Sequence, residues 1–434
     1  DDDALLLALK ELIAARFVVE ESADRYAFRH ALVQQAIAGA LLARERRALH
    51  RAIADALDAR HTSPAAREAH LTDLAHHAYA AESWGRALEY SWRLGERALA
   101  LHAPGAAIAH LNQALDAAAR VPVAPPGQVH LARGQAHATR GEFDRARDDF
   151  ARALELGRRA ADGALEWRAM MALGALWAGR DYAEAGAWFG RAGERAADLA
   201  DQTMRARSLN RLGNWLVNTG RLDQGLAAHR EALAIFEARQ DLPGTAETLD
   251  LLGPAHGMRG ERVAAVELLG RAVALFRALG DTASLITSLA MRAIQSMPGA
   301  SETTLSPLRS RDDCVREAEE ALALARQTES LAGQAFAGNA LAHTLHTFGE
   351  FGPALVRVGE ARRIAAEIGH KQWQIATAYD LGHLHLLLLD PDPAIAAAEA
   401  GLALARELGS RFWIATLAAT LGQARLLRGD LPAA

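Results

Sequence analysis

The histidines of this 434-residue sequence are the first side chains to test for chemistry, because several occur in close pairs. The pairs are His343 with His346, His383 with His385, and His76 with His77. Residues three apart share a helix face and can chelate a metal ion, whereas residues two apart diverge. No cysteine or carboxylate completes a ligand set in the sequence pattern. We therefore expect these histidines to be satisfied within helix packing, and we expect no metal site.

The single cysteine, Cys314, has no partner for an intramolecular disulfide. Its neighbours Asp313 and Glu317 are expected to raise the pKa of the thiol, which argues against a catalytic thiol. One cysteine fits a reducing compartment, and no apolar run approaches the ~20 residues that a membrane span needs. The acidic first three residues are opposite in charge to the start of a signal peptide. The sequence therefore predicts a cytoplasmic protein without membrane contact.

A second group of polar side chains could bind a ligand by hydrogen bonding. Arg207, Asn210, Asn214 and Asn218 follow one another at spacings of 3, 4 and 4 residues, which places them on one helix face. Comparable positions further along hold Glu247, Asp250, Asn339, His343, His346, Tyr379 and His383. A stripe of amides, histidines and a tyrosine suits a peptide or a polar small molecule in a groove. The alternative is a solvated helix face, and both remain open.

No motif for nucleotide chemistry occurs in the chain. The phosphate-binding pattern G-x-x-x-x-G-K-[ST] is absent, and glycine-rich spots such as residues 279–284 are typical of helix ends. We therefore expect no catalytic residues and no bound cofactor in this chain.

Composition favours helices and gives no case for nucleic-acid binding. Hydrophobic residues make up 50% of the chain but aromatics only 6%, so alanine and leucine must form most of the core. The net charge of -5 and the pI of about 6.4 give no basic surface for phosphates. Arg25 and Arg29 could touch DNA, but acidic Glu20, Glu21 and Asp24 lie beside them.

Internal repetition is the strongest signal, and it supplies the elements that position these side chains. Segments that begin at Gly141, Gly220, Gly260 and Gly349 each carry a small residue five positions on and an alanine twelve positions on. Equivalent small residues recur every 39 or 40 residues, with one interval of 49: Ala114, Ala153, Ala192, Ala232, Ala272, Ala321, Ala361 and Gly401. Small residues allow antiparallel helices to approach closely, so the pattern predicts helix-turn-helix hairpins. The long interval predicts an inserted loop at residues 297–313.

The hairpins resemble the tetratricopeptide repeat. The match is best at Leu212, Gly213, Leu222, Gly225, His229 and Ala232. The period near 40 exceeds the usual 34 residues of that family. The resemblance implies an all-α fold, a right-handed superhelix of hairpins whose first helices line the concave face, from about residue 61 to 434. The last repeat is expected to be truncated, and its unpaired helix to promote self-association.

The first 60 residues show a different pattern. A helix over residues 4–15 precedes two short strands, 17–19 and 26–28, on the two sides of a turn at residues 20–24. Helical spacing resumes at His30. A helix, a hairpin and a helix in this order are the closing part of a winged-helix domain. We therefore expect a partial winged helix over residues 1–60 and the repeat array over 61–434.

The stretch after this hairpin resembles the junction that follows the ATPase core in STAND-type signalling ATPases. The matching residues are Phe28, Arg29, His30, Ala31, Leu32, Val33, Ala36, Leu41, Arg46, Arg47, Leu49, His50, Ile53, Ala54 and Leu57. The next segment, residues 74–115, resembles the helical region of MalT-like, LuxR-family transcriptional regulators. The resemblance implies an ATP- or ADP-binding domain upstream of this chain. It also implies that the array binds a partner protein, peptide or small inducer on its concave face and controls the attached ATPase.

Two alternatives have different consequences for function. Some adenylate or guanylate cyclases with an attached ATPase carry a similar junction, in which case the array would regulate a cyclase. A plain protein-protein interaction scaffold would bind partners without any small ligand. Sequence outside this chain would separate the first two readings, and ligand-induced stabilisation would separate a sensor from a scaffold.

Overall fold

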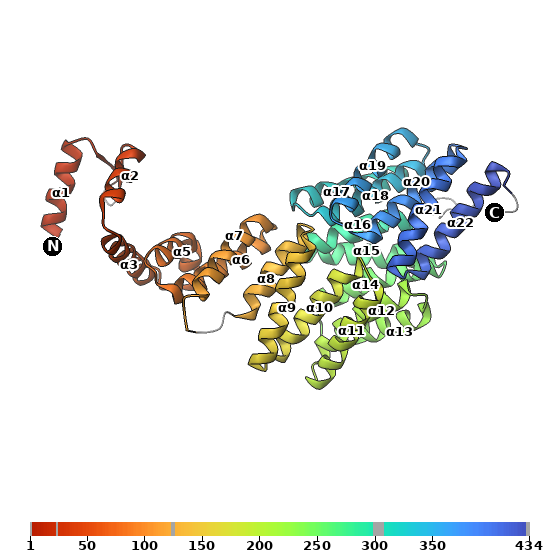
Figure 1. Cartoon of the computed structure of the whole chain (residues 1–434), viewed down its shortest axis with the longest axis horizontal. Helices are drawn as coiled ribbons and strands as arrows, with labels where there is room; N and C mark the ends of the chain where they lie inside the picture. The colour runs from red at the N-terminus through yellow and green to blue at the C-terminus, as the bar shows by residue number, and fades with distance from the viewer. Residues whose placement is uncertain (1, 23–24, 123–125, 298–307, 431–434) are drawn as a thin grey trace. The chain divides into compact units, whose positions relative to one another are not determined.

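The computed structural model of the chain describes residues 2–22, 25–122, 126–297 and 308–430. These residues form 22 α-helices and a two-stranded antiparallel sheet (Figure 1). The predicted all-α fold of helical hairpins is therefore confirmed. Among the described helices, none is long and apolar enough to cross a membrane.

Contacts between residues divide the chain into two compact units. Unit 1 comprises residues 1–94 and 112–125, and unit 2 comprises residues 95–111 and 126–434. The division passes through two helices, α6 (Trp84–Ala100) and α7 (Pro104–Ala118). The domain boundary expected at residue 60 stays a prediction.

Unit 1 begins with a helix, a β-hairpin and two further helices. These elements are α1 (Asp2–Ala14), β1 (Val18–Ser22), β2 (Arg25–Phe28), α2 (Ala31–Ala40) and α3 (Ala43–Arg60). The predicted hairpin is confirmed, with Val18 opposite Phe28 and Glu20 opposite Tyr26. The turn is shorter than expected because β1 continues to Ser22, with an irregular register between Glu20 and Ser22 that absorbs an extra residue.

The rest of unit 1 is helical and has its own small core. It contains α4 (Pro64–Ala69) and α5 (Leu71–Ala80) as well as parts of α6 and α7. The core residues are Leu71, Leu74, Ala75, Ala78, Ala87, Tyr90, Leu94 and Ala117. Leu71 and Leu74 are fully buried, which fixes α5 against its neighbours.

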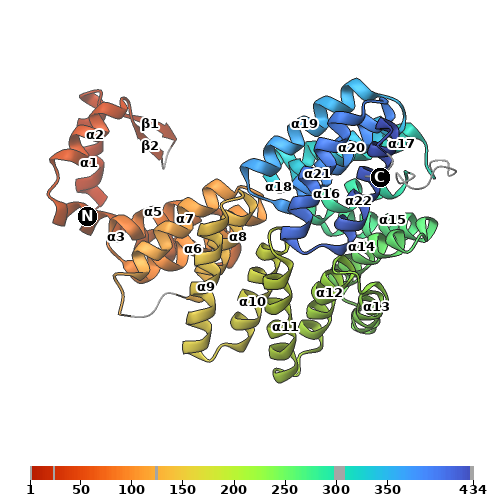
Figure 2. The same ribbon diagram turned by 45° about the vertical axis from the view of Figure 1, so that its right-hand side comes forward.

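Unit 2 is an array of helical hairpins (Figure 2). Its helices after α7 are α8 (Gly127–Thr139), α9 (Phe143–Ala160), α10 (Gly163–Ala178), α11 (Tyr182–Asp198), α12 (Gln202–Asn218), α13 (Leu222–Ala238), α14 (Leu242–Met258), α15 (Arg262–Leu279), α16 (Thr282–Gln295), α17 (Arg311–Gln327), α18 (Leu331–Thr347), α19 (Phe351–Glu367), α20 (Lys371–Leu387), α21 (Pro391–Leu408) and α22 (Arg411–Arg428). Even-numbered helices are the first helices of hairpins and odd-numbered helices are the second.

The repeat pattern read from the sequence is confirmed in its details. All four predicted turn glycines have positive φ, from 75° at Gly141 to 85° at Gly220, a region that side chains disfavour. The eight equivalent small residues are all buried and lie on the second helices. A Cβ added to Gly213 would lie 3.0 Å from the backbone oxygen of Gly225, so α12 and α13 need a glycine at this crossing.

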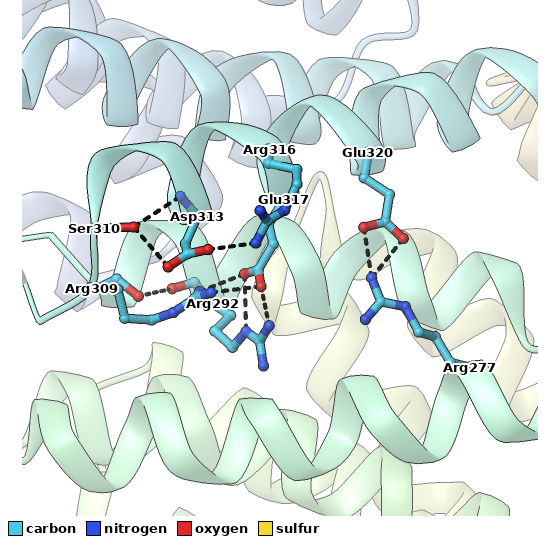
Figure 3. A network of polar contacts seen from close by, with 9 residues as sticks. Arg277, Arg292, Arg309, Ser310, Asp313, Arg316, Glu317 and Glu320 are labelled. Carbon is cyan, nitrogen blue, oxygen red and sulfur yellow. Dashed lines mark hydrogen bonds and ion pairs between the residues drawn. The ribbon is translucent and has the colours of Figure 1, made fainter.

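The expected inserted loop falls mostly outside the described residues, at 298–307, and its two ends are held together. The backbone N–H of Leu308 donates to the carbonyl oxygen of Ser296 at 2.9 Å. Glu317 on α17 accepts hydrogen bonds from Arg292 on α16 and from Arg309, which follows the loop (Figure 3). Burial alone would raise the pKa of Glu317, but the two guanidinium groups hold that pKa below its usual range.

Hairpins that are distant in the sequence also touch within unit 2. The guanidinium of Arg180 donates to the carbonyl oxygen of Ile368, and the N–H of Gln372 donates to the carbonyl oxygen of Gly179 at 3.3 Å. The hydroxyl of Ser410 donates to the carbonyl oxygen of Asn218 at 3.4 Å. These contacts join residues up to 192 positions apart. The turns of the early hairpins therefore pack against the loops that precede α20 and α22.

Candidate functional site

The polar side chains of the first helices mostly hydrogen-bond to one another from one repeat to the next. Four pairs, three of them buried and that of Asp250 half-buried, connect successive first helices: Trp167 with Ser208, Asn210 with Thr248, Asp250 with Ser288, and Asn339 with Asp380. The partners are 38 or 41 residues apart, which is one repeat. We call these four pairs the inter-repeat ladder. Each pair satisfies polar groups that would otherwise be costly to bury.

The ladder changes the interpretation of the predicted ligand-binding stripe. Five of its eleven residues are buried: Asn210, Asn218, Asn339, His343 and His346. Arg207 is exposed, and the remaining five, Asn214, Glu247, Asp250, Tyr379 and His383, are half-buried. The stripe is therefore not one continuous open surface, because neighbouring first helices pack against each other along this face. A ligand role for individual stripe residues stays a prediction.

The middle of the stripe is occupied by local contacts. The amide of Asn218 donates to the backbone oxygen of Asn214 at 2.9 Å, and Arg211 forms a 2.6 Å ion pair with Glu247. Burial raises the pKa of Asp250 to about 6, although the hydroxyl of Ser288 donates to it. These side chains are engaged within the array.

A dense polar group in unit 2 surrounds Asp380. Asn339, His343 and His346 lie on one face of α18, and Asp380 and His383 lie on α20. We call these five residues the Asp380 cluster. Oδ2 of Asp380 accepts from the amide of Asn339 at 2.7 Å, while Oδ1 lies 2.6 Å from Nδ1 of His343 and 3.4 Å from Nε2 of His346.

Burial and charge shift the pKa values in this cluster. Burial would raise the pKa of Asp380, but the charge of His343 and the hydrogen bonds of the two histidines lower it below its usual range. Burial lowers the pKa of His346, and burial with the neighbouring His346 and His343 lowers the pKa of His383 to about 4.

The Asp380 cluster corrects one sequence expectation. We expected no carboxylate to complete a ligand set with the paired histidines, yet Asp380 joins His343 and His346 with donor atoms within 4.8 Å of one another. The pairing was missed because Asp380 is 37 residues from His343. The repeat period is the signal that could have indicated this contact, since residues about one period apart on first helices become neighbours.

An apolar cavity of about 290 Å³ lies within unit 2. It is lined by Leu99, His102, Pro104, Thr139, Ala283, Ile286, Thr287, Thr328, Ser330, Ala332, Gly333, Phe336, His370 and Trp373. We call it the Trp373 cavity. The ring of Trp373 stacks on Phe336 with centroids 4.4 Å apart and on His370 with centroids 5.0 Å apart. None of its lining residues was singled out in the sequence as a binding residue.

The cavity is formed by the beginnings of three first helices and by earlier hairpins. Ile286 comes from α16, Phe336 from α18 and Trp373 from α20, while Leu99 comes from α6 and Thr139 from α8. Burial and the nearby charge of Arg180 lower the pKa of His370 to about 3, so this wall is uncharged near neutrality. Aromatic walls with a few hydroxyl groups suit an apolar side chain or a small aromatic molecule.

A second hollow of about 400 Å³ lies over α9, α10 and α11. It is lined by Arg147, Ala151, Leu154, Glu155, Arg158, Leu173, Trp177, Glu184 and Trp188. Charged side chains with exposed ends form much of its wall, as in the ion pair of Arg152 with Glu155, so water competes with a ligand there. We regard it as the weaker candidate.

Unit 1 contains a histidine group of its own. His50, His76 and His77 offer donor atoms within 4.8 Å of one another, and Nδ1 of His50 lies 2.8 Å from Nδ1 of His77. His76 is exposed. Burial and the neighbouring imidazole of His76 lower the pKa of His50 and His77.

The comparisons with known proteins support the repeat assignment. The tetratricopeptide repeat family model matches residues 204–278. The chain contains a tetratricopeptide repeat region. The match covers α12 to α15, where the sequence resemblance was also best. No curated protein matches the sequence.

Solved structures resemble the chain in fold. The Rap conjugation gene regulator of the plasmid pLS20, in complex with the Phr* peptide, is 14% identical with a TM-score of 0.54, over 68% of this chain and 76% of that one. A Rap protein complexed with Competence and Sporulation Factor is 11% identical (TM-score 0.49), over 80% and 98% of the two chains. A STAND protein with a tetratricopeptide repeat sensor from Pyrococcus horikoshii is 12% identical (TM-score 0.40), over 82% and 57%. At such identities the first of these shows the fold of a tetratricopeptide-like array.

Proposed function

We propose that unit 2 is the sensor of a regulatory protein and that it binds a peptide through the Trp373 cavity. The observation that carries this proposal is the cavity itself, in which the stacked rings of Phe336, Trp373 and His370 form an uncharged wall. Its volume of about 290 Å³ suits one large apolar side chain of a peptide better than a whole cofactor.

The polar rim suits the backbone that would continue from such a side chain. Thr287, Thr328 and Ser330 bring hydroxyl groups to the lining. Thr287 and Thr328 already donate to the carbonyl oxygens of Ser284 and Leu324, so their oxygens can accept from peptide N–H groups. Ser330 accepts from the N–H of Gly333, so its hydroxyl can donate to a peptide carbonyl. The Rap regulator that shares this fold was solved with a peptide bound, which is consistent with a peptide as the ligand.

Binding at this place would change the packing of the array. The lining joins α6 and α8 to α16, α18 and α20, so an occupant would contact both early and late hairpins of unit 2. A ligand that contacts both groups favours the arrangement in which they lie together. This coupling is the means by which a bound peptide would be reported to an attached domain.

In this proposal the attached domain is a signalling ATPase of the STAND type. The full-length protein is then a LuxR-family transcriptional regulator in the cytoplasm. The supporting feature is the apolar surface of the first three helices. Large apolar side chains are exposed there: Leu5, Leu6, Leu7, Leu32, Leu42, Leu49 and Ile53. Exposed apolar side chains in this number are typical of elements that dock against another domain. In this proposal ATP or ADP binds to the ATPase, and unit 2 has no catalytic role.

The test begins with a phage-displayed library of random peptides selected on the full chain. Enriched peptides are synthesised, and their affinities are measured by calorimetry for the parent chain and for Trp373→Ala. We expect the enriched peptides to share an aromatic or branched apolar residue. Trp373→Ala should weaken binding about 30-fold, because truncating a central aromatic anchor costs about 2 kcal/mol.

The matched control is Trp188→Ala, which removes a tryptophan from the second hollow over α9 to α11. Its affinity for the same peptides should equal that of the parent chain. Circular dichroism establishes that both variants are folded. Equal peptide affinity in Trp373→Ala and the parent chain would refute the assignment of the cavity.

A further inference from the structure

The Asp380 cluster brings a carboxylate and two imidazoles together inside unit 2. His343, His346 and Asp380 each offer one donor atom, and these atoms lie within 4.8 Å of one another. Two histidines and one carboxylate are a donor set that zinc and related divalent metals bind in proteins. We propose that His343, His346 and Asp380 bind a divalent transition metal ion of the zinc class. This inference does not rest on the peptide site.

The charge of the cluster favours a cation. Asp380 is 3% exposed, and its bonded partners in the described part of the chain are one amide and two imidazoles, with no arginine or lysine. A buried carboxylate needs a compensating positive charge. Without a metal the charge of His343 supplies it, and a divalent ion between the carboxylate and the two imidazoles would take over this role from the imidazole proton. The nitrogen donors favour zinc over calcium and magnesium, which prefer oxygen ligands.

The distances are close to those of a tetrahedral zinc site. With metal–ligand bonds of about 2.0–2.1 Å, neighbouring ligand atoms lie about 3.3 Å apart. Nε2 of His346 stands 3.4 Å from Oδ1 of Asp380, so this pair is already at the required separation. Nδ1 of His343 stands 2.6 Å from the same oxygen and must withdraw by about 0.7 Å.

The surroundings hold the carboxylate in position. Asn339 donates to Oδ2 of Asp380 at 2.7 Å, which leaves Oδ1 to face the two histidines. Hydrogen bonds of this kind orient the ligands in natural metal sites. The metal ligands come from α18 and α20, so the ion would link the first helices of two successive repeats.

A second observation independently indicates a missing partner. Oδ1 of Asn339 and Nδ1 of His346 have no hydrogen-bond partner, although their residues are 3% and 1% exposed. Nδ1 of His383, next to them, also lacks a partner. Buried polar atoms without partners are rare, and three in one cluster indicate that it is completed by a bound species. A water ligand on the ion would donate to Oδ1 of Asn339, whereas Nδ1 of His346 points away from the metal-binding Nε2 and needs a partner of its own.

The test measures zinc binding by the full chain in a background that lacks the histidine group of unit 1, with His50→Gln and His77→Gln. The protein is stripped with a chelator and titrated with zinc chloride against a chromophoric competitor. We expect one tightly bound zinc ion per chain. Asp380→Asn should weaken zinc binding at least about 100-fold, since even the loss of an outer hydrogen bond costs about 10- to 100-fold.

A matched control and a second variant keep the test decisive. His385→Gln, on the same helix but outside the cluster, should bind zinc as the background does. If Asp380→Asn fails to fold by circular dichroism, His346→Gln carries the same expectation. Zinc should also raise the melting temperature of the background protein and of His385→Gln, but not that of Asp380→Asn or His346→Gln. Equal zinc affinity in background and variant, or only weak binding of several ions, would overturn the proposal.

Discussion

At the scale of single residues, the buried histidines determine how the protein responds to acid. His370 lies at the start of α20, where its Nδ1 accepts a hydrogen bond from the N–H of Trp373 at 3.4 Å. Burial and Arg180 lower the pKa of His370 to about 3, and burial with Arg211 lowers the pKa of His229 to about 4. Both side chains therefore stay neutral in the folded protein at pH values where the unfolded chain is protonated.

We predict that acidification weakens the fold through these histidines. Between pH 6.5 and about 4 the unfolded state binds more protons than the folded state, so the stability present above pH 6.5 is lost as the pH falls. Each such histidine contributes up to about 1.4 kcal/mol per pH unit to this loss. Urea unfolding followed between pH 7 and pH 4 measures the slope.

The variant His370→Asn isolates one contribution. Asparagine keeps an acceptor at the N-cap of α20 but does not titrate, so the pH dependence should become shallower. The same change at His30, which is exposed, serves as the control and should leave the pH dependence unchanged. An unchanged slope in His370→Asn would show that this histidine is not buried in its neutral form.

At the scale of elements, the ion pairs that connect α17 to α15 and α16 differ in burial. Glu317 is 5% exposed and lies between Arg292 and Arg309, whereas the side chain of Glu320 is 35% exposed and pairs with Arg277 at 2.6 Å (Figure 3). A buried charge without its partners is costly, but an exposed one is solvated by water.

We predict a large difference between two otherwise identical substitutions. Glu317→Gln should lower the free energy of unfolding by about 3 kcal/mol, because it leaves two largely buried guanidinium groups unpaired. Glu320→Gln should change it by less than about 1 kcal/mol. Chemical denaturation of both variants beside the parent chain measures the two values. Similar values for the two would mean that Glu317 is not the anchor of this junction.

The elements themselves could be predicted from the sequence because their signals are local. Turn glycines such as Gly141 and Gly220 and small residues such as Ala232 report on contacts within one hairpin. The end of β1 was placed too early, since an irregular register lets Ser22 remain in the strand. Residues 298–307 of the expected insertion lie outside the described residues, so the prediction of a loop there stays open.

At the scale of the whole molecule, contacts between repeats determine which side chains are buried and where a cavity forms, and the sequence alone did not predict either. The polar stripe lies on first helices, and much of it is buried because Asn210 and Asn339 find partners one repeat away. The Trp373 cavity depends on residues from Leu99 to Trp373, and no local pattern marks such a set. Burial across repeats depends on how neighbouring first helices pack, which a sequence period does not specify.

The central claim is that a peptide binds in the Trp373 cavity and joins distant hairpins of unit 2. Hydrogen–deuterium exchange of the full chain, with and without an enriched peptide, tests it most directly. We predict slower exchange at the cavity walls, in residues 282–287, 328–336 and 370–373. Two results would contradict the account. One is slower exchange confined to residues 147–188, over α9 to α11, and the other is unchanged exchange in all three cavity segments.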